Sequence, residues 1–176
     1  SASYATYAAN GGVTKIIAGG GITISPSLGL GDVTINSTAA NYNTATGSYG
    51  SFYDTTTQTA AAINTPTSMS FNTVDISNGV SISGSTNSSI KITNTGVYNI
   101  QFSAQLARNA GSGTEDVLIW LRKNGSDLSW TNTDVTFAGG TNIRQVAAWN
   151  WFVNSAANDY FELMWSTTST NIIIES

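Results

Sequence analysis

The stretch TGVYNIQFSAQLA, residues 95–107, decides the fold that this sequence predicts. In an extended strand successive side chains point to opposite faces, so one face here is almost entirely apolar. That face carries Tyr98, Ile100, Phe102, Ala104 and Leu106, and the other carries Val97, Asn99, Gln101, Ser103 and Gln105. A slip of one residue would expose the whole apolar set, so the pattern predicts a strand with a strongly fixed register.

The same kind of pattern recurs on both sides of this strand. From Tyr49 onward, short alternating runs are separated by Gly- and Asn-rich turns at intervals of roughly 8 to 15 residues, as in a sandwich or barrel. No window keeps apolar residues at helical spacing. We therefore expect an all-β double sheet with strands at 52–58, 69–75, 79–83, 89–93, 95–107, 117–125, 128–137, 143–153, 159–166 and 171–175.

The N-terminal segment has a different character. Three short apolar runs, at 13–17, 22–24 and 33–35, are separated by glycine-rich turns. Isolated hairpins of this length are marginal in water, so strands from other chains would be needed for stability. A flexible linker is the alternative, but it would not need isoleucine at alternate positions. We expect a Gly-rich β-stalk or linker over residues 1–45 and a head domain over 46–176.

Composition narrows the possible functions. The 176 residues include no cysteine and no histidine, and only 9% are charged. Acid–base catalysis near neutral pH relies mainly on histidine or on carboxylates with shifted pKa values, so an enzyme is disfavoured and no metal or other cofactor is expected. Six lysines and arginines with a net charge of −4 argue against nucleic acid as a partner. No apolar run is long enough for membrane insertion.

Three segments in order carry a family resemblance. Residues 95–106 (TGVYNIQFSAQL), 117–125 (VLIWLRKNG) and 156–166 (AANDYFELMWS) resemble the tumour-necrosis-factor-like jelly roll of complement-type globular heads. They are more similar to its version at the C-terminal ends of tailed-bacteriophage virion proteins, and residues 16–35 are similar to a stretch upstream of such heads in phage fibre and decoration proteins. The family often has Gly where Asn158 stands, but Asn tolerates the same left-handed turn.

The resemblance implies a jelly-roll β-sandwich that assembles as a homotrimer, with one sheet facing the threefold axis. In the family the strands like 95–106, 143–153 and 171–175 form that sheet. The last two carry large apolar side chains on both faces, and a strand covered on both sides needs a second partner. The expected trimer-interface residues are Trp149, Trp151, Gln101, Ile172 and Ile174.

The strand EDVLIWLRKNG, residues 115–125, is apolar on both faces. The resemblance places it in the outer sheet with Val117, Ile119 and Leu121 inward. Leu118 and Trp120 on the other face are then either shielded, by a loop or by an arginine laid along the indole, or offered to a partner. Adjacent carboxylates at 115 and 116 point to opposite faces without a calcium-loop motif, so we expect them to be solvated.

A candidate ligand surface follows from these residues. Aromatic rings can cover the apolar faces of sugars while amides, carboxylates and hydroxyls bind sugar hydroxyl groups. The candidate residues are Trp120, Arg122, Trp130, Asn132 and Asp134. The alternative is that Trp130 fills the core or a subunit interface.

Together these observations predict a non-enzymatic, trimeric protein of the virion surface. Its expected partners are other copies of itself, other virion proteins of the capsid or fibre shaft, and host-surface carbohydrate. One hypothesis is a fibre-type head for host attachment. The other is a capsid decoration or head-fibre protein that attaches to the capsid and stabilises it.

Overall fold

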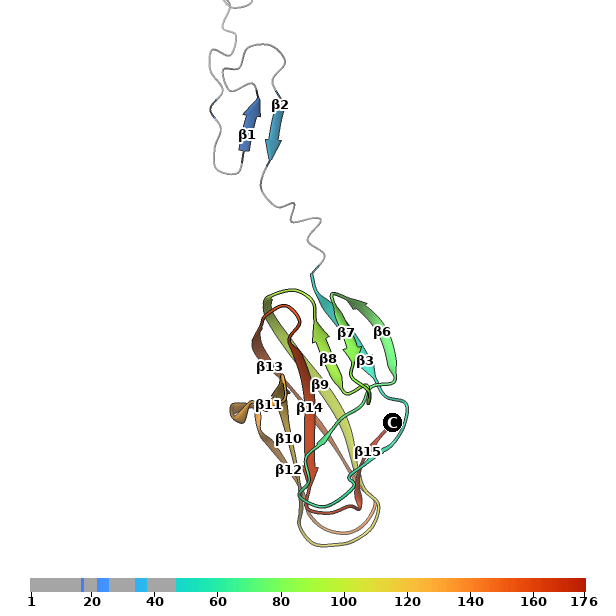
Figure 1. Ribbon diagram of the computed structural model, residues 1–176. Coiled ribbons are helices and arrows are strands. Elements are labelled where there is room, and N and C mark those ends of the chain that lie inside the picture. The colour runs from blue at the N-terminus through green and yellow to red at the C-terminus, as the bar shows by residue number, and fades with distance from the viewer. Residues whose placement is uncertain (1–16, 18–21, 26–33, 38–46) are drawn as a thin grey trace, which may run out of the picture. The chain divides into compact units, whose positions relative to one another are not determined.

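The computed structural model describes residue 17 and residues 22–25, 34–37 and 47–176 (Figure 1). Strands joined by turns and loops make up this described part, and its only helix is the short 3-10 turn η1 (Ser129–Thr131). No helix in this described part is long and apolar enough to span a membrane. The chain divides into two compact units, Ser1–Thr46 and Gly47–Ser176.

Two short strands are described in the N-terminal unit. β1 (Ile22–Ser25) and β2 (Thr34–Ser37) pair with each other in antiparallel fashion, with Ile24 opposite Ile35. Both lie where the alternating pattern predicts them. The run predicted at 13–17 falls outside the described residues except for Ile17, which is in no strand. Ile35 is 60% exposed, so this hairpin leaves part of its apolar surface uncovered.

The C-terminal unit contains two larger antiparallel sheets and a small one. The first sheet consists of β11 (Ser126–Asp127), β10 (Glu115–Lys123), β14 (Tyr160–Thr167), β8 (Ser89–Ile92) and β7 (Val80–Ser83), with β12 (Thr133–Phe137) beside β10 and β5 (Thr67–Ser68) beside β14. The second consists of β13 (Ile143–Ser155), β9 (Gly96–Arg108), β15 (Ile172–Glu175) and β4 (Gln58–Thr59). The small sheet pairs β3 (Tyr49–Tyr53) with β6 (Thr73–Asn78).

The hydrophobic core lies between the two larger sheets. Alternate residues of β9 and β10 point into it, and Leu106, Val117 and Ile119 are completely buried. Trp165 of β14 is also fully enclosed. Residues of both sheets form one cluster, an arrangement consistent with a β-sandwich. The prediction of an all-β fold is therefore confirmed, and so is the alternation that the sequence predicts along β9.

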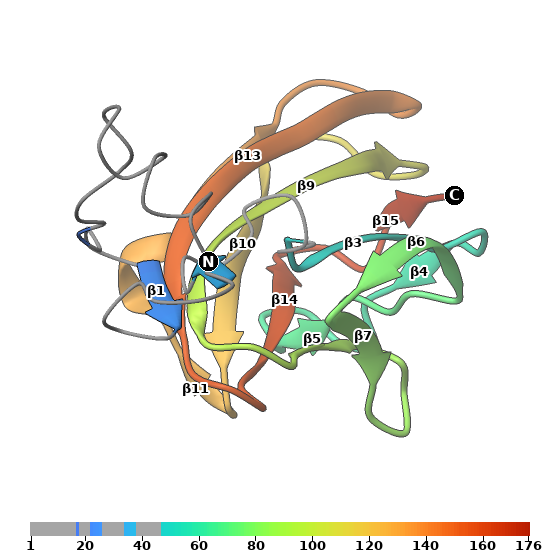
Figure 2. The same cartoon turned by 90° about the horizontal axis from the view of Figure 1, so that it is seen from above.

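The longest strand pair fixes the shape of the second sheet. β9 and β13 are in continuous antiparallel register from Gly96 opposite Ser155 to Arg108 opposite Ile143. Figure 2 shows the two strands curving together along one side of the C-terminal unit. The inward Phe102 stacks on Trp151 and meets the edge of Trp149, each with a centroid separation of 5.3 Å. These aromatic contacts hold the two strands to the core.

Candidate functional site

The candidate site begins at a tight hairpin. Lys123 lies opposite Ser126 in the β10–β11 register, so Asn124 and Gly125 form a two-residue turn. Both have positive φ, 49° and 79°, as a type I′ turn requires. This turn brings Asp127 back opposite Arg122.

Arg122 and Asp127 form an ion pair at this hairpin. Arg122 Nε donates to Asp127 Oδ1 over 2.7 Å. This bond from Arg122, followed by one from the Trp120 side chain, lowers the pKa of Asp127 below its ordinary value of 3.8. The indole of Trp120 is only 9% exposed and lies outside the main core cluster. Trp120 is therefore shielded within this chain rather than offered to a partner.

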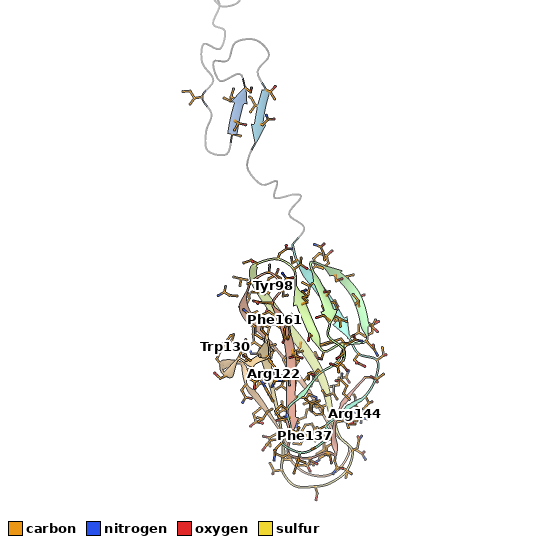
Figure 3. The ribbon with its side chains drawn as sticks, in the orientation of Figure 1. Tyr98, Arg122, Trp130, Phe137, Arg144 and Phe161 are labelled. Carbon is orange, nitrogen blue, oxygen red and sulfur yellow. The ribbon has the colours of Figure 1, made fainter. Side chains whose placement is uncertain are left out.

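The short helix η1 presents Trp130 to solvent. Thr131 is fully buried, and its hydroxyl donates to the carbonyl of Leu128 over 2.6 Å and accepts from the backbone N–H of Leu121 over 2.9 Å. This anchor fixes η1 against β10, while Trp130 beside it remains 62% exposed. In Figure 3, Trp130 lies at the margin of the C-terminal unit, on the same side as Arg122. The alternative that Trp130 is a core residue of this chain is excluded.

Asn132 and Asp134 complete this corner. Both are exposed, and Asp134 lies opposite Leu118 in the β10–β12 register. The five predicted ligand-surface residues therefore come from β10, η1 and β12, which are neighbouring elements. Trp120 is buried beneath this surface. The groups that a ligand could reach are the indole of Trp130, the guanidinium of Arg122, the amide of Asn132 and the carboxylates of Asp127 and Asp134. We call these accessible groups, from Arg122 to Asp134, the Trp130 corner.

The predicted trimer-interface residues are placed differently. Ile172 is fully buried, Ile174 is 7% exposed and Trp151 is 8% exposed, while Trp149 is half-buried against Phe102. Residues of the same chain cover these four side chains wholly or in part, so they offer little surface to another copy. Their place in a trimer interface stays a prediction. Only Gln101 lies on the outward face of its sheet. β13 carries large side chains on both faces: Trp149 and Trp151 point inward, and Phe152 points outward.

Sequence reasoning missed the most enclosed charge in the described residues. Arg108 is fully buried and donates to the carbonyl oxygens of Gly113, Gly139 and Gly140. Its Nη1 lies 3.6 Å from Glu115 Oε2. Glu115 is 15% exposed, so the expectation that it is solvated is wrong. The only sequence signal was a charged residue at the end of an apolar strand, next to glycine-rich loops.

The described part of the chain has no group of three or more acidic side chains that could hold a metal ion. Comparison with known protein families finds no family model that matches this chain, and comparison with the curated proteins finds no significant match.

Proposed function

We propose that this chain is a non-enzymatic surface protein of a tailed-bacteriophage virion. In this proposal a trimeric, tumour-necrosis-factor-like jelly-roll head follows a Gly-rich β-stalk and binds host-surface carbohydrate. The observation that carries the binding role is the Trp130 corner, where a largely exposed indole on η1 follows closely in the chain after the Arg122–Asp127 ion pair and precedes the exposed Asn132 and Asp134. Such a combination suits a sugar, whose apolar face stacks on the ring while its hydroxyls meet polar side chains.

The path of the chain between the two larger sheets supports a jelly roll. β8, β10 and β14 belong to one sheet, while β9, β13 and β15 belong to the other. The chain therefore crosses between sheets repeatedly, as in the Greek-key connections of jelly rolls. The three segments that the resemblance assigns to one sheet, 95–106, 143–153 and 171–175, are the segments of β9, β13 and β15.

The outward face of β9 and β13 supports assembly with further copies. We call it the amide face and define it by Asn99, Gln101, Gln105, Val146, Asn150 and Phe152. Val146 and Phe152 are each 67% exposed, and Asn150 Nδ2 donates to Asn99 Oδ1 over 2.8 Å. None of these six residues is charged. An exposed face that mixes apolar groups with amides is typical of an interaction surface.

The carbohydrate role is tested by removing the exposed indole. Trp130→Ala should weaken binding of the purified protein to host cells or to immobilised glycans by roughly tenfold or more, since burial of one large apolar side chain contributes about 1.5–3 kcal/mol. Three linked copies would amplify this effect through avidity. Glycan-array fluorescence and cell binding are the measurements.

The matched control is Ile76→Ala, which removes another exposed apolar side chain, on β6. It should bind as the unaltered protein does. Equal binding by all three proteins would refute the Trp130 corner as the carbohydrate site.

A capsid-decoration role is the second candidate. It is favoured by the small β3–β6 sheet, where Tyr49, Tyr53, Val74 and Ile76 are each about half exposed. Such a patch can attach to another virion protein. Co-sedimentation with purified capsids, without binding to host cells, would select this role over host attachment.

A further inference from the structure

β9 has a strand partner along only part of one edge. On one side it pairs with β13 over its entire length, from Gly96 to Arg108. On the other side β15 pairs only with the residues from Gln105 to Arg108. Within the described residues, no strand lies along Gly96–Ala104 on that side. Alternate backbone N–H and C=O groups of this stretch are therefore left without strand partners, as at a sheet edge.

A groove of about 1100 Å³ runs along this open edge. β3 lines its opposite wall, and the inward Tyr98, Ile100 and Phe102 of β9 line the near wall. Phe52 of β3 and Leu163 of β14 also contribute to the lining. Tyr98, Ile100 and Phe52 are only partly buried, although all three pack against the core. The apolar interior is thus accessible beside an unpaired backbone.

The neighbouring strands define what fits into the groove. β15 lies between β9 and β4, with Ile174 opposite both Leu106 and Gln58. Farther along, the groove is bounded by the same β9 and by β3, which precedes β4 in the chain. A strand in the groove would therefore continue the line of β15 and connect β9 with β3. Because β13 and β15 both run antiparallel to β9, the same direction is expected for the occupant.

The register also predicts the side-chain pattern of the occupant. Extension of the β15 register places successive residues opposite Ser103, Phe102, Gln101 and so on toward Val97. Residues opposite Phe102, Ile100 and Tyr98 would point into the apolar interior, and those between them would lie beside the amide face. The expected occupant is therefore an extended segment in which apolar residues that face the interior alternate with uncharged polar residues that lie beside the amide face.

Charge favours one orientation of this segment. Asp54 and Glu175 are charged side chains that line the groove. Glu175 is the last residue of β15, and Asp54 is linked to Gln58, opposite Ile174, because Ser70 hydrogen-bonds to both. Glu175 is paired with Arg144. The Asp54 carboxylate accepts hydrogen bonds from Thr56, Ser70 and Asn72, all uncharged. An antiparallel occupant has its N-terminal end here, so a lysine or arginine at that end would face uncompensated negative charge.

We propose that this groove binds an extended segment of a partner polypeptide by strand addition, with alternating apolar residues and a cation at the segment's N-terminal end. The added strand pairs with β9 from Val97 to Ser103 and joins the β13–β9 sheet to β3. Main-chain hydrogen bonds supply affinity and the apolar groove selects the alternation, as in other strand-addition sites. This inference does not depend on the virion role or on carbohydrate binding.

The test uses the full chain and a fluorescein-labelled synthetic peptide, KTITITIT. Fluorescence polarisation should show saturable binding, and hydrogen exchange should show slower exchange of the 97–103 amides on peptide addition. Replacing the isoleucines by aspartate should abolish binding. N-methylation of alternate peptide amides should also abolish it, because strand addition requires those donors.

Two apolar-to-acidic substitutions on different sheets separate groove contacts from general effects. Ile100→Glu, which points inward from β9, should weaken peptide binding roughly tenfold to a hundredfold. Leu118→Glu, on β10 of the opposite sheet and outside the groove, should change it only slightly. If Ile100→Glu does not fold, the test of the proposal is hydrogen exchange of the unaltered chain, in which the 97–103 amides should exchange more slowly when the peptide is added. Equal binding of the N-methylated peptide would indicate a pocket for apolar ligands and overturn the proposal. Protection of 97–103 that rises with protein concentration alone would assign the edge to a second copy, and absence of binding would also refute the proposal.

Discussion

At the scale of single residues, Arg108 has the most demanding environment. A buried guanidinium needs several acceptors, and three loop carbonyls supply them, while the Glu115 carboxylate is its ion-pair partner at 3.6 Å. Arg108→Met keeps the approximate volume but leaves the Glu115 carboxylate enclosed without its cation. We expect a loss of about 3–5 kcal/mol in the free energy of unfolding, measured by urea denaturation.

The control for this prediction is Arg122→Met, which removes the partly exposed partner of Asp127. Exposed ion pairs contribute about 0–1 kcal/mol, so this variant should unfold near the midpoint of the unaltered protein. Adding Glu115→Gln to Arg108→Met should restore part of the lost stability because it removes the unpaired charge. If the two arginine variants lose equal stability, the buried arginine has no special structural role.

Asparagine at turns was the residue-scale feature best anticipated from the sequence. The expectation that Asn158 lies in a left-handed turn is confirmed by its φ of 71°. Every other non-glycine residue with positive φ in the described part of the chain is also asparagine. Its short polar side chain lowers the local cost of this conformation, so such turns can be recognised without tertiary information.

At the scale of elements, one cluster ties two turns together. Asp159 accepts hydrogen bonds from Lys123 Nζ, Asn124 Nδ2 and the Ala156 N–H, each over 2.7 Å. The bond from Lys123, then those from Asn124 and Ala156, lower the pKa of Asp159 from 3.8 to about 2. The cluster therefore joins the β10–β11 turn to the turn that precedes β14.

This cluster predicts a pH dependence. Because the folded-state pKa of Asp159 is below its unfolded value of 3.8, its stabilising contribution is fully present above about pH 4 and is lost as the pH falls toward 2. Urea midpoints measured from pH 5 down to pH 2 should therefore fall less steeply for Asp159→Asn than for the unaltered protein. Asp75→Asn, at an exposed position on β6, should keep the original slope. An identical slope for Asp159→Asn would contradict this account.

The strands themselves were largely predictable, because alternation and turn residues are local signals. β9, β10, β13, β14 and β15 lie within two residues of their predicted bounds. The stretch 128–137 was predicted as one strand, yet it divides into η1 and β12. Its break depends on the Thr131 hydroxyl bonded to Leu121, a contact between separate elements that a local pattern does not contain.

The candidate site was predictable only in part for the same reason. Proximity of Trp130 and Asp134 in sequence indicated a shared surface. In the structure both side chains are exposed, and both η1 and β12 lie beside β10. The side chain of Trp120 hydrogen-bonds to Asp127 of β11, and Trp149 of β13 meets Phe102 of β9. Both are contacts between separate strands. Alternation identifies two faces of a strand, but when both are apolar it does not say which faces the core.

At the scale of the whole molecule, the proposed trimer depends on the amide face. Val146 and Phe152 project from this face, opposite the uncharged amides of Gln105 and Asn99 in the β9–β13 register. Light scattering at micromolar concentration should give a mass near three times the chain mass of 18.4 kDa. A double substitution, Val146→Glu with Phe152→Glu, should convert the trimer to monomer because it buries unpaired carboxylates against like charges from neighbouring copies.

The matched control is Leu118→Glu, an apolar-to-acidic change at an exposed position of the opposite sheet. It adds a charge without touching the amide face, so the trimeric mass should persist. Because Val146 and Phe152 point away from the core, the double variant should retain the circular dichroism spectrum of a folded β protein. A monomeric mass for the unaltered chain would refute the trimer, and a trimer that tolerates both glutamates would require a different face for assembly.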